Sequence, residues 1–375
     1  MLKMGIKNLN KFLREKCPQV FEPIHISHYG FKKVAIDISL YLHKFKAIAG
    51  DQWLGAFLNL IASLRRNQIH CVFIFDGKSP PEKEEEKKKR QQERLKLEKY
   101  IYELEDAVDE YHKIGVVPEI LIKLYRRRKA PRRLLRERKE IDMEWVLEKV
   151  QQKRNQIISI QPSDFESAKE LFDILNVPYY TAPWEAEKMC AKLCLDGLVD
   201  AVLSEDTDVI AYMAPVFLTK IDTRSDTAIQ LRNESIQKAL DLIPPHLLDL
   251  CIMCGTDYNS NIFGIGAHKA YKKIQQFGDI DGITLKTKLD TSILKHKRVR
   301  ELFTHFEDYK IDSIPYCGVP DYDKLLTFLL THKIWRDSRK SHCSHLEMAT
   351  AKLEKLKKDF TLTVIVFDED ETQTK

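Results

Sequence analysis

Three short apolar runs, each closing on an acidic residue, constrain the fold of this chain more than any other feature. They are Val34-Ala35-Ile36-Asp37, Val72-Phe73-Ile74-Phe75-Asp76 and Ala201-Val202-Leu203-Ser204-Glu205-Asp206. Runs of β-branched and aromatic residues without polar alternation are typical of strands buried on both faces of a parallel sheet. Helical patterns over 53–67 and 183–196 separate the runs. This alternation of strand and helix predicts an α/β fold with a central, mainly parallel sheet.

The acids that end these runs mark one edge of the predicted sheet. Parallel strands bring their carboxyl ends to the same edge, where open α/β sheets form their sites. Any one of these acids alone would be read as a helix cap or a turn residue. Other acids stand at similar positions, after the third strand, at the start of the helix after Pro183, and at a helix end. The whole set is Asp37, Asp76, Glu185, Glu187, Asp206, Asp208 and Asp257.

If these carboxylates converge, they need cations. Like charges within a few ångströms raise each other's pKa and destabilise a fold unless they are neutralised. A set of oxygen ligands suits Mg²⁺ or Mn²⁺ and not zinc. Two such ions about 4 Å apart can activate water and stabilise the leaving oxygen of a phosphodiester. The spacing of the acids suggests this convergence without proving it.

Composition excludes some classes of protein. The net charge of +5 says little for 375 residues, and no run approaches the roughly 18–20 apolar residues of a membrane span. The N-terminus lacks the apolar core of a signal peptide. Eight scattered cysteines indicate reduced thiols in an intracellular protein, with Cys190/Cys194 and Cys251/Cys254 expected in the core. The cluster His342-Cys343-x-His345 has no second pair at zinc-finger spacing.

Six ordered motifs resemble those of the flap endonuclease/XPG family of 5′-nucleases, over roughly residues 4–335. They are Met4-Gly5-Ile6-Lys7-Asn8-Leu9, Val34-Ala35-Ile36-Asp37, Phe75-Asp76-Gly77-Lys78, Ala182-Pro183-Trp184-Glu185-Ala186-Glu187, Ser204-Glu205-Asp206-Thr207-Asp208 and Gly255-Thr256-Asp257-Tyr258. Gly264-Ile265-Gly266 also falls where that family has its helix–two-turn–helix. The resemblance implies a PIN-like 5′-nuclease fold and a Mg²⁺-dependent enzyme, with Mn²⁺ as a substitute, that cuts DNA near junctions of single and double strands.

The resemblance also implies a division of the chain. We expect an N-terminal nuclease region over 4–81, a helical arch insertion over 82–155 and an internal nuclease region over 156–250. A helix–two-turn–helix DNA-binding region over 251–345 and a tail over 346–375 would follow. The interval of 109 residues from Asp76 to Glu185 is longer than we expect of a flap endonuclease and much shorter than the spacer of the large XPG repair proteins.

Site roles follow from the resemblance residue by residue. Asp37, Asp76 and Glu187 would hold one Mg²⁺, with Glu185 acting through water. Asp206 and Asp208 would hold the second ion, with Asp257 nearby. Lys83 and Arg90 match the Lys and Arg that contact the scissile phosphate in the family, and their spacing of seven puts them on one helix face. A solvated charged helix is the alternative for these two residues.

DNA contacts are expected at three further places. His43 takes the position of a base-stacking Tyr in some flap endonucleases and can itself stack, although burial in a helix is equally compatible. The Gly264-Ile265-Gly266 turn, with Lys269 after it, would approach duplex phosphates and could bind K⁺ through its carbonyls. The block 123–139 holds ten Lys/Arg against one acid, so it suits the phosphates of a threaded single strand. Its expected contacts are Arg126, Arg127, Arg128, Arg132 and Arg133.

Two expectations concern the ends of the chain. The family pattern begins at Met-Gly, but Met4-Gly5 follows Met1-Leu2-Lys3, so we expect translation to start at Met4. Intact Met1 on active protein, detected by mass spectrometry, would contradict this. We find no C-terminal Gln-x-x-Leu-x-x-Phe-Phe sliding-clamp motif, so no clamp partner is expected by that route. We expect a monomer that acts in the nucleus, or in the host nucleus if the chain is viral, in DNA replication, repair or recombination.

Three alternatives stay open. A Holliday-junction-type resolvase would use the same fold, and the long arch could favour it. A non-catalytic nucleic-acid-binding protein would also use this fold, but retention of all seven acids counts against it. A phosphatase-like metal hydrolase on another α/β fold is disfavoured by the Gly-Ile-Gly turn and its lysines, since small substrates need no duplex anchor.

Overall fold

The protein is described by a computed structural model covering residues 5–126, 142–154, 157–306, 311–335 and 344–361. Within these residues a single seven-stranded sheet has the order β1-β7-β6-β5-β2-β3-β4. Its strands are β1 (Glu22–His25), β2 (Lys33–Asp37), β3 (His70–Phe75), β4 (Tyr179–Thr181), β5 (Ala201–Leu203), β6 (Val216–Asp222) and β7 (Thr227–Arg232).

The pairings from β6 through β5, β2 and β3 to β4 are parallel, whereas β7 pairs antiparallel with both β6 and β1. The expected α/β architecture with a mainly parallel sheet is therefore confirmed. The antiparallel β6–β7–β1 edge was not predicted.

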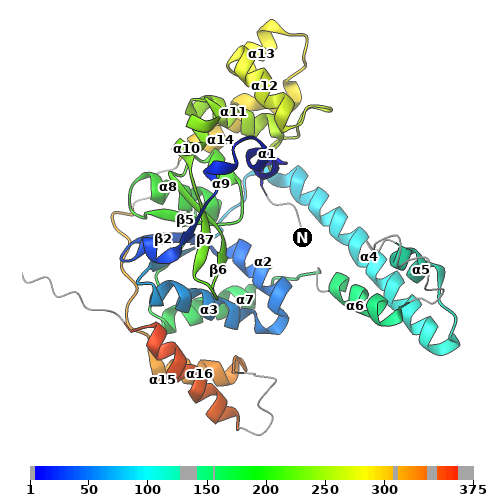
Figure 1. The fold of residues 1–375 in the computed structure, drawn as a ribbon, viewed down its shortest axis with the longest axis vertical. Coiled ribbons are helices and arrows are strands. Elements are labelled where there is room, and N and C mark those ends of the chain that lie inside the picture. The colour runs from blue at the N-terminus through cyan, green and yellow to red at the C-terminus, as the bar shows by residue number, and fades with distance from the viewer. Residues whose placement is uncertain (1–4, 127–141, 155–156, 307–310, 336–343, 362–375) are drawn as a thin grey trace, which may run out of the picture.

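Helices cover both faces of the sheet (Figure 1). The helices of the nuclease body are α1 (Leu9–Lys16), α2 (Ile38–Ala49), α3 (Trp53–Arg66), α7 (Pro162–Ile174), α8 (Ala186–Leu195), α9 (Asp208–Ala211) and α10 (Asn233–Leu240). Side chains alternate along the strands, so Ala35 packs with α1 and α8 while Val34 and Ile36 pack with α2 and α3. This two-sided burial explains why the strands read as continuous apolar runs.

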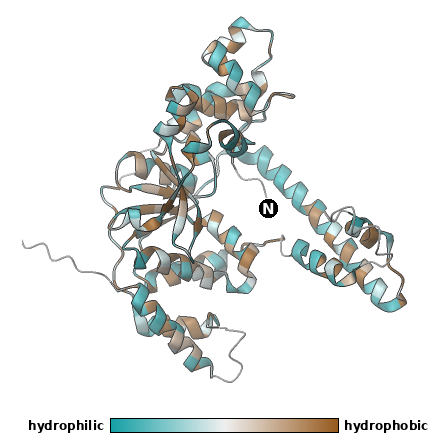
Figure 2. Cartoon of the chain, viewed as in Figure 1, coloured by the Kyte–Doolittle hydropathy of each residue, from teal (hydrophilic) through white to brown (hydrophobic). Residues whose placement is uncertain are grey.

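The charged segment after β3 forms one long helix, α4 (Glu84–Ile114), of 31 residues, preceded by a 3₁₀ turn, η4 (Pro81–Lys83). It projects away from the sheet together with α5 (Glu119–Arg126) and α6 (Met143–Arg154) (Figure 1). The near half of α4 is hydrophilic (Figure 2). The far half shares a small core of its own with α5 and α6, built on Leu104, Leu121 and Val146. The projecting unit α4–α6 thus has its own apolar packing.

The helices beyond Pro244 form two groups. The first is α11 (Pro244–Cys254), α12 (Ala267–Phe277), α13 (Ile280–Lys286) and α14 (His296–Thr304), which continue the core of the α8 face. The second is α15 (Tyr322–Thr331) and α16 (His345–Asp359), which pack on the α3 face. The seven described cysteines, including the two predicted core pairs, are buried free thiols. None of the described helices combines the length and apolar character needed to cross a membrane.

Candidate active site

The carboxyl ends of the central strands carry the predicted acids. Asp37 is the last residue of β2 and caps α2, since its Oδ1 accepts the amide of Ser39 at 2.8 Å. Asp76 directly follows β3, which lies beside β2 in parallel register. Asp206 lies three residues beyond the end of β5, on the other side of β2. Three segments far apart in the chain therefore deliver their acids to one sheet edge.

Asp206 and Asp208 are linked through the backbone. The amide of Asp208 donates to Asp206 Oδ1 at 2.9 Å as the chain turns into the short helix α9. Both side chains are buried. Asp208 Oδ1 is buried and has no hydrogen-bond partner within the described residues. A buried anionic oxygen without a donor is costly, so this atom calls for a cation.

Glu185 and Glu187 enter from the start of α8. The amide of the intervening Ala186 donates to Asp76 Oδ1 at 2.9 Å, so the start of α8 is bonded to the end of β3. Burial, followed by the charge of Asp206, raises the pKa of Glu187 well above its usual range. The two segments carrying Asp76 and Glu187 are thus held side by side.

Two phenols hold Glu185 and were not predicted as site residues. Glu185 Oε2 accepts a short hydrogen bond from the hydroxyl of Tyr258 and one of 3.3 Å from Tyr212. The two hydroxyls lie 2.6 Å apart. Tyr258 directly follows Asp257 in the last acidic motif, which was a signal for it. Tyr212 stands in an apolar stretch at the end of α9 and reads as a core residue.

Lys83 and Arg90 both point into the acidic cluster. Lys83 Nζ lies 2.5 Å from Glu185 Oε1 and 3.3 Å from Asp257 Oδ2. An Nη of Arg90 donates to Asp257 Oδ1 at 2.6 Å. Burial opposes the charge on Lys83, but the surrounding carboxylates, Glu187 first, raise its pKa well above the usual range. The end of η4 and the start of α4 therefore supply the cluster with one fixed cation each.

Burial and mutual repulsion raise the pKa of several acids in the cluster. Burial, and then the charge of Asp76, raises the pKa of Asp37 well above its usual range. Burial raises the pKa of Asp206 to about 6, against the amide of Asp208, which lowers it. For Asp208, burial acts first, and the charges of Asp206 and Asp257 add to it. Such mutual shifts are typical of functional sites.

The first described residues pack directly against this cluster. A Cβ at Gly5 would lie 2.1 Å from Asp206 Oδ1, and the φ of Gly5 is +76°. The amide of Ile6 donates to Thr207 Oγ1 at 3.0 Å, and that of Lys7 to the carbonyl of Gly255 at 3.1 Å. Only glycine fits at position 5. Met1 and Met4, on which the expected start site depends, lie outside the described residues.

The donor set fits a hard divalent ion, although the side chains are not prearranged as a metal cage. Among the described residues, no three His, Cys, Asp or Glu side chains form a group that could hold a metal ion. Lys83 and Arg90 neutralise Glu185 and Asp257 here, which leaves the buried Asp208 Oδ1 as the unsatisfied ligand atom. Carboxylate oxygens in a buried, anionic cluster are the ligands that Mg²⁺ and Mn²⁺ prefer.

The expected DNA contacts lie in three places. His43 is half-buried on α2, and burial, with Arg94 adding to it, lowers its pKa. Arg126 is exposed at the end of α5. The other expected arch contacts lie outside the described residues: Arg127, Arg128, Arg132 and Arg133.

The Gly264–Gly266 turn connects α11 to α12. Open space surrounds both glycines where a Cβ would stand. Ile265 is buried, so only its backbone is available to a ligand. Lys269 Nζ donates to the carbonyl of Gly264 at 2.9 Å.

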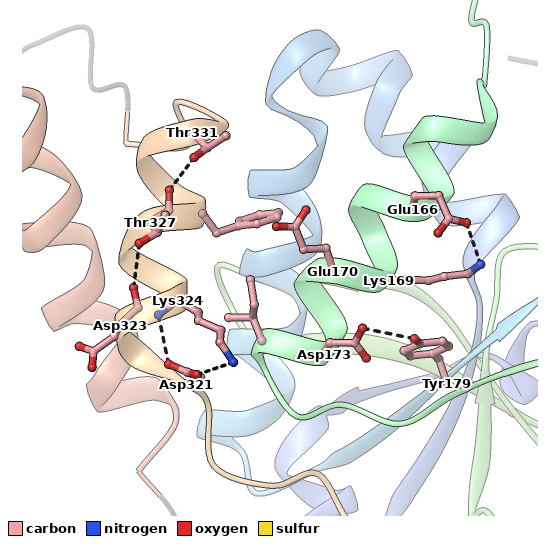
Figure 3. Close-up of a pocket in the computed structure, with 12 residues that line it drawn as sticks. Glu166, Lys169, Glu170, Asp173, Tyr179, Asp321, Asp323, Lys324, Thr327 and Thr331 are labelled. Carbon is pink, nitrogen blue, oxygen red and sulfur yellow. Dashed lines mark hydrogen bonds and ion pairs between the residues drawn. The ribbon is translucent and has the colours of Figure 1, made fainter.

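A larger cavity, of about 700 Å³, lies between α7 and α15 (Figure 3), and none of the seven acids lines it. Five of its twelve lining residues are acids, and its two lysines are paired, Lys169 with Glu166 and Lys324 with Asp321. A smaller cavity of about 80 Å³ lies behind Glu185, between η4 and α14. The acidic cluster, and not the larger cavity, carries the candidate chemistry.

Known proteins are similar to this chain both in sequence and in fold. The XPG N-terminal domain matches residues 4–97, and the XPG I-region matches residues 176–257. A probable RAD2-like endonuclease of Invertebrate iridescent virus 6 is 33% identical over 341 residues, covering 83% of this chain and 82% of that protein. The chain belongs to the XPG/RAD2-like endonuclease family. The family expected from the motifs is therefore confirmed.

Two further matches extend the similarity of this RAD2-like chain to a flap endonuclease and to a solved structure. Flap endonuclease 1 of Debaryomyces hansenii is 27% identical over 90% of this chain and 86% of its own length. The catalytic core of Rad2 in complex with DNA substrate superposes with a TM-score of 0.64 over 94% of this chain and all of that structure, at 19% identity. At that identity the likeness establishes the fold, and the expected 5′-nuclease fold is confirmed.

Proposed function

We propose that this RAD2-like family member is a divalent-metal-dependent, structure-specific DNA nuclease that cuts phosphodiester bonds near junctions of single and double strands. It would act as an endonuclease on flaps and gaps and as a 5′→3′ exonuclease at nicks. The observation that carries the proposal is the set of acids at one edge of the sheet, among them Asp208, whose buried Oδ1 has no described partner. Lys83 and Arg90 lie at the same cluster.

The acids would hold the metal ions. We assign Asp37, Asp76 and Glu187 to one ion, with Glu185 acting through water, and Asp206 and Asp208 to the second, with Asp257 nearby. Mg²⁺, or Mn²⁺ in its place, would supply an activated water and neutralise charge on the leaving oxygen. The chain's own part is to fix the carboxylates by backbone amides and phenols. Lys83 and Arg90 would donate to the scissile phosphate, where cations stabilise charge that develops on the phosphoryl oxygens.

The DNA path follows from the surrounding elements. The duplex would lie against the Gly264–Gly266 turn, whose open backbone leaves room for a phosphate. K⁺ could bind the carbonyls of this turn, in competition with Lys269 at Gly264. His43 would lie under a base at the junction. The division into regions 4–81, 82–155, 156–250, 251–345 and 346–375 stays part of this proposal, as do a monomeric state and a nuclear location, or the host nucleus if the chain is viral.

The arch would pass the single strand along its arginines, so this step has its own test. Replacing Arg126, Arg127, Arg128, Arg132 and Arg133 with Ala should weaken binding of a flap and flatten the dependence of affinity on salt, because fewer counterions are released. An unchanged salt slope would refute the assignment of these residues.

The central test is cleavage of labelled flap, nicked, gapped and four-way DNA with Mg²⁺. We expect cleavage next to the junction in the wild type and none with Asp206→Ala, whose folding is checked by circular dichroism. Equal activity of a folded Asp206→Ala protein would sink the two-metal assignment. Cutting of the four-way substrate in preference to flaps would favour the resolvase alternative.

A further inference from the structure

Phe263 is the most exposed large apolar side chain among the described residues. Its relative exposed area is 101%, so the ring touches almost nothing in the protein. It stands in the loop that projects from the body between α11 and α12 (Figure 1). A fully solvated phenyl ring forgoes the free energy of apolar burial, which a binding partner could recover.

The ring is held out by a well-defined turn. The amide of Ile265 donates to the carbonyl of Ile262 at 3.0 Å, which closes a four-residue turn around Phe263 and Gly264. Gly264 has a φ of +74°, as the third position of a type II turn requires. The side-chain amide of Asn261 donates to the carbonyls of Ile262 and Ile265 at 3.3 and 3.2 Å. The turn is therefore braced from inside.

The residues on either side of the ring anchor the turn in the core. Ile262 and Ile265 pack against the apolar cluster of the α8 face. Phe263, between them, points to solvent. The backbone of a braced and anchored turn loses little conformational freedom on binding, so the ordering cost is confined largely to the ring itself.

The surroundings of the ring are basic and not apolar. Lys269 and Lys272 are exposed on α12, and Lys273 is half-exposed. The backbone at Gly264 and Gly266 is open. Histidine 268 on the same helix is paired with Glu15 at 2.8 Å. A single ring among cations and bare backbone lacks the contiguous apolar area of a protein interface.

We propose that Phe263 is a duplex-DNA contact, with its ring against the deoxyribose surface of the minor groove and the lysines and turn amides on the flanking phosphates. Apolar side chains are used against the minor groove in other DNA-binding proteins. The inference rests on the proposed function in one respect, that the ligand is DNA. It adds an uncharged contact that neither phosphate binding nor the metal site provides.

The first experiment places a reporter at the position itself. Phe263→Trp is titrated with an uninterrupted DNA duplex, and its fluorescence change is corrected for the wild-type signal. Phe31→Trp is the control, because Phe31 is also exposed but precedes β2, at the opposite edge of the sheet from the acids. We expect a change of emission with duplex for Phe263→Trp only, and wild-type affinity by fluorescence anisotropy.

The second experiment separates the ring from the charges. Phe263→Ala should weaken duplex binding roughly tenfold while leaving the slope of affinity against salt unchanged, since no phosphate contact is lost. Lys272→Ala should instead reduce that slope by about one unit. Phe31→Ala should change neither quantity.

The outcomes distinguish this inference from the proposed function. Duplex binding without any signal from Phe263→Trp, or with full affinity in Phe263→Ala, overturns the role of the ring and leaves the nuclease proposal standing. A fall in the salt slope of Phe263→Ala also overturns it, because the turn itself would then have been lost. No binding of DNA by the wild type overturns both.

Discussion

The acids of the site differ in whether their buried oxygens have hydrogen-bond donors. Its Oδ1 is buried without a described partner, whereas Asp37 and Asp206 each accept a backbone amide. Burial and neighbouring charge raise the pKa of Asp208, which means that its ionised form works against folding at neutral pH. If Asp208 holds a metal ion as proposed, cation binding should offset this cost to stability.

Asp208→Asn should therefore stabilise the metal-free protein and disable the enzyme. The unfolding temperature with EDTA should rise, because one repulsive charge is gone. Addition of Mg²⁺ should raise the unfolding temperature of the wild type more than that of the variant. Cleavage should fall by more than the roughly 10- to 100-fold typical of losing an outer-shell group. A variant that is less stable in EDTA and still active would contradict both parts.

Tyr258→Phe tests whether the phenols position Glu185. Loss of the hydroxyl leaves Glu185 Oε2 with only the 3.3 Å bond from Tyr212. We expect kcat to fall about 10- to 100-fold, as for other outer-shell partners, with KM for DNA unchanged. Tyr271→Phe is the matched control, since that buried hydroxyl donates to the carbonyl of Leu240 away from the acids. A rise in KM with constant kcat would assign Tyr258 to DNA binding instead.

At the scale of elements, the projecting helices divide into two parts. Lys83 at the end of η4 and Arg90 in the first turns of α4 bind the acidic cluster, while the far half of α4 shares a separate core with α5 and α6. Between them α4 runs without tertiary packing for nearly two turns, since residues 91–96 are exposed. A helix of 31 residues is about 46 Å long, so the far core lies well away from the acids.

Leu104→Ala should loosen this far core without unfolding the sheet. Leu104 is fully buried, so the truncation should cost about 2–5 kcal/mol locally. Hydrogen exchange should speed up in α5 and α6 and stay unchanged in β2 and β3. Leu95→Ala, on the exposed stretch of the same helix, should have no effect. Faster exchange throughout the sheet would show that the two cores fold as one.

The elements also show what sequence reasoning reached and what it missed. Strands buried on both faces, such as β2 and β3, can be recognised in the sequence by their unbroken apolar runs. The β6–β7 hairpin does not, because β7 alternates exposed and buried residues and Lys220 to Asp222 of β6 reach solvent. The acids that follow the strands could be predicted because the carboxyl ends of parallel strands meet at one edge of the sheet. Tyr212 was not, since a phenol among apolar residues looks the same whether or not its hydroxyl holds a carboxylate.

Across the whole molecule, the base of the projecting unit is joined to the C-terminal helices. Arg298 of α14 donates from Nε to Glu82 Oε1 at 2.8 Å, next to Lys83 in η4. This pair bridges the small cavity behind Glu185. The helical group α11–α14, whose α11–α12 loop carries the proposed duplex contact, therefore touches η4, the turn that ends at Lys83.

Arg298→Glu should slow cleavage by displacing η4, because it sets two acids against each other. Stability should hardly change, since exposed ion pairs contribute little. The double variant Glu82→Lys/Arg298→Glu should restore cleavage, and the readout is kcat/KM on a flap. Failure of the double variant to recover any activity would show that Arg298 acts on DNA and not through Glu82.

The neighbouring positions of β2 and β5 have a consequence for synthesis. Val34 of β2 pairs with Ala201 of β5, so β2 is synthesised well before the strand it pairs with. Asp257 comes later still. A nascent chain that ends before β5 lacks Asp206, Asp208 and Asp257, so the acidic cluster cannot yet be assembled. The order of these segments in the chain therefore places completion of the proposed active site late in synthesis.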